Sequence, residues 1–153
     1  PKPAPACRWS LDCAAGVSPA YVDTGVNILR VDDVAEGHAL AVESGAVGEK
    51  YILGGENDLL GDLFAMVSEI AHVPPPKIRL PQEVIWPVAI LSEWLSRSFG
   101  INPRVTREML AMSRKKMFFS SDKAKHALGY NPRPARKAVE DAITWFRNNG
   151  MLK

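Results

Sequence analysis

The sequence is short of the residues from which metal sites and disulfide frameworks are built. Its 153 residues include 2 cysteines, Cys7 and Cys13, and 3 histidines. A structural zinc site needs a second pair of ligands beside this cysteine pair, and the histidines are scattered without HExxH spacing. We therefore expect no metal site and two reduced thiols, as in a cytoplasmic protein.

Long apolar runs and an excess of one charge are also absent. The longest apolar stretch, Val84–Leu91, contains Pro87 and falls far short of the roughly 20 residues that span a membrane. Basic and acidic side chains number 19 and 17, for a formal net charge of +2. This balance excludes an electrostatic argument for nucleic acid or for an anionic membrane. A small-molecule ligand is the partner that we expect.

The motifs of cofactor binding and nucleophilic catalysis are missing as well. No glycine spacing matches GxGxxG or a P-loop. The segment Gly16–Ala20, GVSPA, has the start of a nucleophile elbow, but the last glycine is missing and Pro19 follows the serine where a helix should begin. On local chemistry alone, the chain is not a self-sufficient enzyme.

What the sequence does contain is an alternation of strand and helix patterns. The apolar run Val26–Val31 predicts a buried strand, and shorter strands are predicted within Glu49–Gly55 and at Lys77–Leu80. Helical spacing and end signals predict helices over 7–16, 34–44, from Asn57 or Asp58 to about 71, over 83–99, around 106–112, over 121–128 and over 135–148. The fold class is α/β, with a first strand that lacks neighbours.

Two adjacent acids stand where the first strand gives way to a helix. Asp32 and Asp33 could be a catalytic carboxylate pair, a metal site or the start of that helix. Glu36 follows Asp33 at the spacing of a capping box, so we interpret Asp33 as a helix cap. His38 falls on the apolar face of the same helix, where a packed histidine is favoured over a catalytic base.

Two further clusters admit a functional and a structural interpretation. Ser113–Phe119, SRKKMFF, could form an anion clamp, or a basic helix C-terminus with Phe118 or Phe119 buried, and the second is favoured. Trp86, Ile90 and Trp94 repeat at helical spacing and could serve an interaction surface, a pocket or the core.

Three segments together resemble a known family. Val26–Val42 (VNILRVDDVAEGHALAV), Gly48–Asn57 (GEKYILGGEN) and Phe118–Phe146 (FFSSDKAKHALGYNPRPARKAVEDAITWF) are similar to the C-terminal half of extended short-chain dehydrogenases/reductases, the group of NAD-dependent epimerases/dehydratases and dihydroflavonol 4-reductases. Within it, PAYVDTGVN, YILGGEN and KKMFFSS look most like hopanoid-associated sugar epimerases.

The resemblance implies the C-terminal portion of a doubly wound Rossmann-type fold with a mostly helical substrate-side lobe. Residues 1–20 would be an irregular segment with a truncated start, and 21–153 the substrate-binding portion. The family binds NAD(P) through a glycine-rich turn and reacts through a YxxxK pair, both implied to lie before Pro1. No tyrosine here has a lysine four residues later, so no catalytic or cofactor-binding residue is expected in the chain. A dimer is implied only for the full-length enzyme.

The resemblance also suggests substrate-side residues. Arg30, where the family commonly has histidine, and Asp32 would sit beside the active-site crevice, with Arg79 and Lys116 as further anion contacts. Val26 replaces an arginine that meets the pyrophosphate of nucleotide sugars, which disfavours such a substrate and leaves a smaller sugar, a ketone or a polyprenoid-linked substrate. The alternatives are a non-catalytic remnant or binding module without a cofactor site, or a helical interaction domain.

Overall fold

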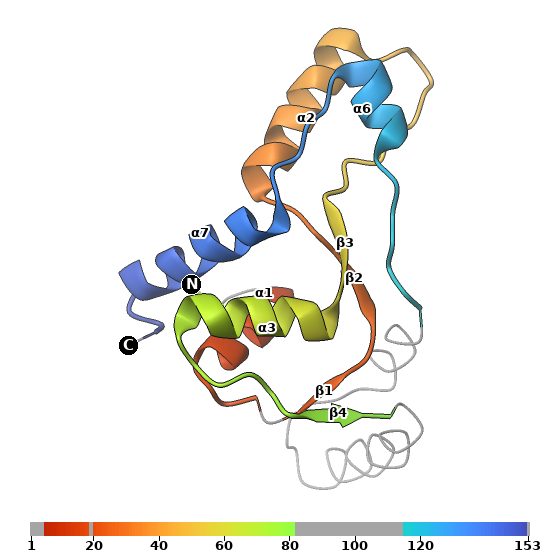
Figure 1. The fold of residues 1–153 in the computed structure, drawn as a ribbon. Helices are drawn as coiled ribbons and strands as arrows, with labels where there is room; N and C mark the ends of the chain where they lie inside the picture. The colour runs from red at the N-terminus through yellow and green to blue at the C-terminus, as the bar shows by residue number, and fades with distance from the viewer. Residues whose placement is uncertain (1–4, 19, 82–114, 153) are drawn as a thin grey trace, which may run out of the picture.

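The computed structural model describes residues 5–18, 20–81 and 115–152 (Figure 1). The helices are α1 (Pro5–Ala14), α2 (Val31–Ser44), α3 (Leu60–Ala71), α6 (Asp122–Leu128) and α7 (Ala135–Asn148), and the strands are β1 (Ala20–Val22), β2 (Gly25–Ile28), β3 (Glu56–Leu59) and β4 (Ile78–Leu80). The helices predicted over 83–99 and 106–112, with their tryptophans, lie outside the described residues.

The strands form two separate two-stranded sheets. β1 pairs in parallel with β4, with Tyr21 opposite Arg79, and β2 pairs antiparallel with β3, with Val26 opposite Asp58. The strand predicted from Val26 is confirmed as β2, although it ends at Ile28 because α2 begins already at Val31. The strand predicted at 49–55 is not formed. The strand in this region is β3, which lies just after it.

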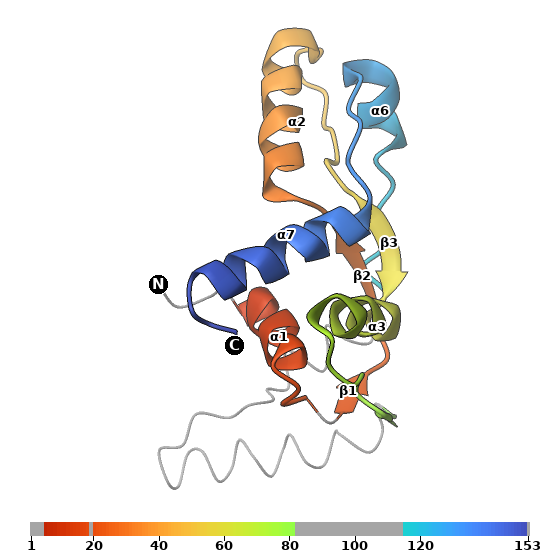
Figure 2. The same ribbon diagram turned by 60° about the vertical axis from the view of Figure 1, so that its left-hand side comes forward.

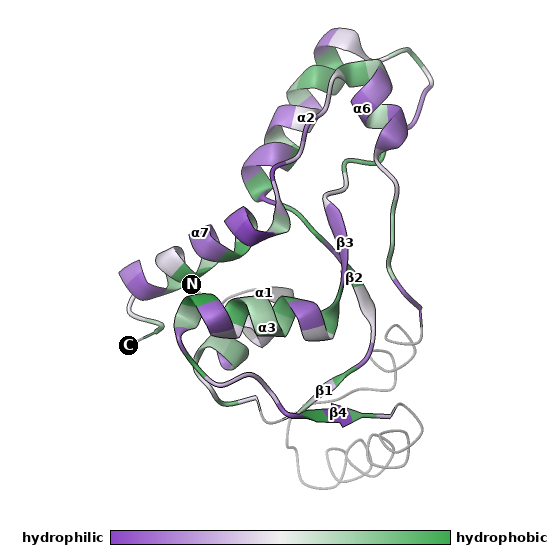
Figure 3. Cartoon of the chain, in the orientation of Figure 1, coloured by the Kyte–Doolittle hydropathy of each residue, from purple (hydrophilic) through white to green (hydrophobic). Residues whose placement is uncertain are grey.

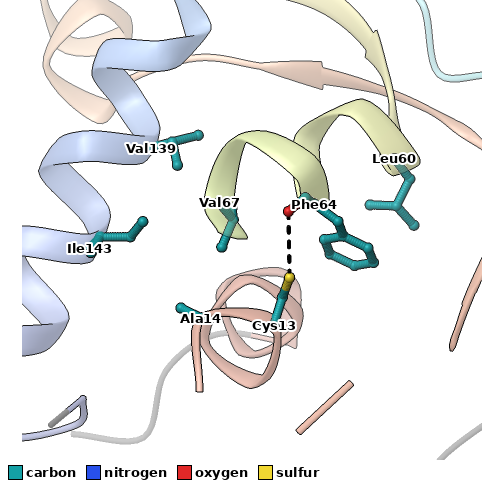
Figure 4. Close-up of a cluster of buried hydrophobic side chains, with 7 residues drawn as sticks. All are labelled: Cys13, Ala14, Leu60, Phe64, Val67, Val139 and Ile143. Carbon is teal, nitrogen blue, oxygen red and sulfur yellow. Dashed lines mark hydrogen bonds between the residues drawn. The ribbon is translucent and has the colours of Figure 1, made fainter. Parts of the chain in front are cut away.

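The main core joins three helices from distant parts of the sequence. α1 and α7 both pack on α3, and the buried side chains between them are Cys13, Ala14, Leu60, Phe64, Val67, Val139 and Ile143 (Figure 4). α7 is amphipathic, as predicted over 135–148, and its ribbon alternates between hydrophilic and hydrophobic colours (Figure 3). The side chains of Val139, Ile143 and Phe146 are buried. Each large apolar side chain buried here contributes about 1.5–3 kcal/mol to stability.

A second, smaller core holds α2 against α6, which lie side by side in both ribbon views (Figures 1 and 2). Ala124, Leu128 and Tyr130 form its buried centre, and Tyr51 and Leu53 pack against it from the segment that precedes β3. The predicted helix over 121–128 is confirmed, and it ends at Gly129 in the left-handed region, φ 71°.

The first 20 residues contain regular structure. They were expected to be irregular apart from a short helix near Cys7–Gly16, and the structure has α1 over Pro5–Ala14, packed into the main core. The Cys13 thiol is buried and donates a weak hydrogen bond to the carbonyl oxygen of Phe64 at 3.7 Å (Figure 4). Within the described ranges, no helix combines the length and apolar character needed to cross a membrane.

Candidate functional site

An apolar pocket of about 160 Å³ opens where the end of β2 meets the main core. The end of β2 supplies Ile28 and Leu29, and three helices close the remaining sides. The helical lining consists of Ser10 from α1, Leu63 and Val67 from α3, and Ala138, Val139, Ala142, Ile143 and Phe146 from α7. The apolar residues of α7 recur at three- and four-residue intervals, so they share one face of the helix. This face lies toward the pocket. A pocket so lined fits the apolar part of a ligand.

Arg30 directly follows the lining residue Leu29, but its charge is already engaged. One guanidinium nitrogen, Nη2, lies 2.8 Å from Asp32 Oδ2 and 2.8 Å from Asp141 Oδ2, and the side chain is 18% exposed. Asp141 stands on α7 next to the lining residue Ala142. Asp141 Oδ1 also lies 3.5 Å from Nζ of Lys137, so two cations and two carboxylates meet here and Arg30 has no unpaired charge for an anionic ligand.

Asp33, the predicted helix cap, has a different role. α2 begins at Val31 with Arg30 as its N-cap, and no side chain makes a capping hydrogen bond there. Asp33 therefore lies inside the first turn, where it is 2% exposed and accepts a hydrogen bond from the backbone N–H of Arg133 at 2.9 Å. The capping interpretation is wrong because this carboxylate serves a tertiary contact. The two acidic side chains also have different partners. Asp32 is exposed and forms an ion pair with Arg30.

His38 is exposed rather than packed, so that expectation is also wrong. Its Nδ1 lies 2.7 Å from the carbonyl oxygen of Val34, one turn earlier on α2. The imidazole ring contacts the backbone of its own helix. Among the described residues it makes no contact with a carboxylate. His72 and His126 are exposed near the ends of α3 and α6.

The other two predicted site residues lie near the opposite end of β2. Arg79 on β4 pairs with Asp23, which follows β1. Lys116 lies beside Gly25, the first residue of β2, and its Nζ is 5.9 Å from the ring centre of Phe118. The four residues proposed from the sequence thus form two groups, and the structure does not bring them together around one ligand.

The segment 115–119 is fixed along β2 and β3 by an amide that sequence reasoning missed. Asn57 donates to the carbonyl oxygen of Phe119 at 2.9 Å and accepts from its N–H at 3.1 Å. Phe118 and Phe119 are 43% and 47% exposed, so the expected burial of one of them is wrong. Lys116 makes no ion pair within the described part of the chain.

The acidic residues of β3 and of the first turn of α3 repel one another electrostatically. Burial raises the pKa of Asp58, and the neighbouring carboxylates of Glu56 and Asp62 raise it further. Glu56 also accepts a hydrogen bond from the backbone N–H of Ala135 at 2.8 Å, which links β3 to the start of α7. The contacts of Asp141 and Glu56 could not be found from local patterns, because their partners lie far away in the sequence.

The glycines near the site serve close packing: a Cβ at Gly55 would meet the carbonyl oxygen of Ile28, and one at Gly25 would meet the Phe118 ring. A pyrophosphate needs a glycine-rich turn between a strand and a helix N-terminus, and no glycine in the described ranges occupies such a turn. The described residues also hold no group of three metal-ligating side chains.

Comparison with known proteins relates the chain to longer oxidoreductases and epimerases. No family model matches the sequence. The chain is 35% identical to a putative dihydroflavonol 4-reductase of Synechocystis over 99% of its own length, but it spans only 46% of that protein. The chain therefore spans less than half the length of this curated relative.

Solved structures of longer proteins are also similar to the chain in fold. The crystal structure of gox2253 is 68% identical, with a TM-score of 0.81, over 99% of this chain and 46% of that one. A nucleoside-diphosphate-sugar epimerase from Pseudomonas aeruginosa is 24% identical, with a TM-score of 0.76, over 95% of this chain and 43% of that one. These similarities confirm the family resemblance and the Rossmann-type fold class predicted from the sequence.

Proposed function

We propose that this chain, which is similar over almost its whole length to the C-terminal portion of extended short-chain dehydrogenases/reductases, forms the substrate-side part of an NAD(P)-dependent reductase or epimerase. The observation that carries the proposal is the 35% identity to a putative dihydroflavonol 4-reductase over 99% of the chain. The cofactor and the catalytic YxxxK pair would belong to the part of the relatives that lies outside the aligned region.

The apolar pocket beside Arg30 supports a substrate with an apolar portion. Its lining is aliphatic and aromatic apart from Ser10, and the nearby arginine is paired with Asp32 and Asp141. Val26, where an arginine would meet a nucleotide-sugar pyrophosphate, instead packs against the main core. Within the family we therefore favour a hydrophobic ketone or a small lipid-linked sugar, of the kind suggested by the likeness to dihydroflavonol 4-reductases and hopanoid-associated epimerases.

A hybrid protein tests this function. It joins the part of gox2253 that precedes the aligned region to this chain, which replaces a segment of 68% identity. We expect the hybrid to bind NADH or NADPH by calorimetry and to oxidise the reduced cofactor with hydrophobic ketones, while the chain alone binds neither cofactor. A folded hybrid that binds neither cofactor would contradict the proposal.

Two variants of the hybrid test the pocket itself. Ala142→Phe fills the pocket with a ring, so KM for a ketone should rise at least about tenfold, the loss of roughly 1.4 kcal/mol of binding, with cofactor affinity unchanged. Thr144→Phe places the same ring on the exposed face of α7 and should change neither. Equal effects of the two variants would exclude the pocket as the substrate site.

A further inference from the structure

Among the residues that the structure describes, Ser10 is the polar member of the pocket lining. It lies on α1 three and four residues before Cys13 and Ala14, which are 2% and 5% exposed. Residues at these spacings share one face of a helix, so Ser10 belongs to the face of α1 that packs into the main core. Its half-buried side chain therefore brings a hydroxyl group to an otherwise apolar wall.

The protein itself does not use this hydroxyl group. A serine or threonine in a helix can bond back to the carbonyl oxygen four residues earlier, as Thr144 on α7 does to Glu140 at 2.8 Å. The buried Ser68 instead pairs with the Cys13 thiol, 3.6 Å away. The side chain of Ser10 makes neither kind of hydrogen bond within the described ranges. Its donor and acceptor sites are therefore available to a ligand.

The pocket has room for one ring. Its volume is about 160 Å³, and an apolar cavity of about 150 Å³ lined by similar side chains binds benzene. The charges at its rim, Arg30 and Asp141, are paired with each other, so a polar group on the ring should be neutral. We infer that the pocket binds a six-membered ring carrying a neutral hydroxyl or carbonyl group, and that the Ser10 hydroxyl forms a hydrogen bond with that oxygen.

The inference deepens the proposed function and rests on it, because it takes this pocket as the substrate site. An apolar wall accepts any hydrophobic group of suitable size, whereas a single polar group fixes the orientation of the ligand. A ring without the oxygen would cover the Ser10 hydroxyl and leave it without a partner, which costs binding energy. Ser10 therefore determines specificity by favouring oxygenated rings over hydrocarbons of the same shape.

Two small probes of similar shape test the inference in this chain alone. Phenol carries a hydroxyl group where toluene carries a methyl group, and NMR shifts of the Ala142 methyl group in the lining report the binding of each. Ser10→Ala should weaken phenol binding about three- to tenfold, the net worth of one neutral hydrogen bond. Toluene should bind unchanged or more tightly. Alanine is the best helix former, so the variant should fold.

The matched control is Thr144→Val, which removes a hydroxyl group from the exposed face of α7. It should change the affinity for neither probe. Equal losses of phenol and toluene affinity in Ser10→Ala, or no loss of phenol affinity, would overturn the inference. Failure of both probes to shift the Ala142 methyl signal, at concentrations up to the solubility of toluene, would overturn it as well.

The hybrid described above separates this inference from the proposed function. A selective loss of phenol binding in this chain, together with a hybrid that binds neither cofactor, would support the ring site and contradict the function. A hybrid that oxidises the reduced cofactor with cyclic ketones, while Ser10→Ala leaves phenol binding unchanged, would support the function and overturn the role of Ser10.

Discussion

Asp33 and Arg133 are 100 residues apart in the sequence and are joined twice in the fold. One carboxylate oxygen accepts the backbone N–H of Arg133 at 2.9 Å, and the other lies 3.1 Å from its guanidinium. The carboxylate is 2% exposed, whereas the arginine side chain is 46% exposed. This contact connects the first turn of α2 to the loop between α6 and α7.

The first prediction concerns this contact. Asp33→Ala leaves a backbone N–H without its acceptor and should lower the free energy of unfolding by about 1–3 kcal/mol. Asp32→Ala, which alters the exposed neighbour, should change it by less than about 0.5 kcal/mol. Urea denaturation at pH 7 measures both, and equal losses would show that Asp33 acts only through the charge of the helix terminus.

The second prediction concerns Gly37, which lies inside the α2–α6 core. A Cβ at this position would come within 2.8 Å of the Leu53 methyl carbons and 3.1 Å of the Tyr130 ring. Gly37→Ala should therefore destabilise the protein by about 1–3 kcal/mol, although the same change in an exposed helix stabilises by up to about 1 kcal/mol. A higher Tm for Gly37→Ala in thermal denaturation would contradict this packing.

The buried thiol of Cys13 should impose a pH dependence. Burial raises the pKa of Cys13 above its ordinary value of 9.0, and the hydrogen bond with Ser68 opposes this in part. A raised folded-state pKa gives stability that is complete below pH 9.0 and is lost as the pH rises through the folded pKa. Cys13→Ala should remove this alkaline loss, so the stability difference between the two proteins should shrink above pH 9.0. A constant difference would mean that the thiol does not titrate differently on unfolding.

The ion pair between α3 and α7 gives a prediction at acid pH. The Arg136 guanidinium, 2.8 Å away, holds the pKa of Glu69 below its ordinary value. A lowered folded-state pKa gives stability that is present above the unfolded pKa and is lost as the pH falls through the folded one. NMR titration should show the pKa of Glu69 rising in Arg136→Met and unchanged in Lys137→Met, the matched change at the adjacent cation. A Glu69 pKa that is the same in Arg136→Met would disprove the pairing.

Elements whose signals are local could be predicted from the sequence. The apolar spacing of 135–148 predicted α7 with its buried face, and Gly129 predicted the end of α6, because a helix pattern and a glycine terminator depend on neighbouring residues alone. The start of α2 was missed, since Arg30 serves as N-cap without a capping side chain and carries no sequence signal.

The parts that escaped prediction depend on distant partners. Residues 50–54 have the composition of a strand, but no described segment pairs with them. Arg30 and Asp32 were predicted as site residues because they lie at the end of the predicted strand. Asp141 was not predicted, because its sequence context is that of an ordinary helix surface, with Lys137 one turn earlier. Its role follows from the approach of α7 to β2, which no local pattern contains.

The main core has a consequence for biosynthesis. α1, near the beginning of the chain, packs against α3 and also touches α7 near its end. Chains leave the ribosome from the N-terminus at about 5–20 residues per second, so α1 emerges well before its last partner. The apolar faces of α1 and α3 must remain together without Val139 and Ile143 until α7 has been synthesised. During that interval the exposed apolar faces of α1 and α3 must be kept from associating with other chains. The order of the helices in the sequence makes this necessary.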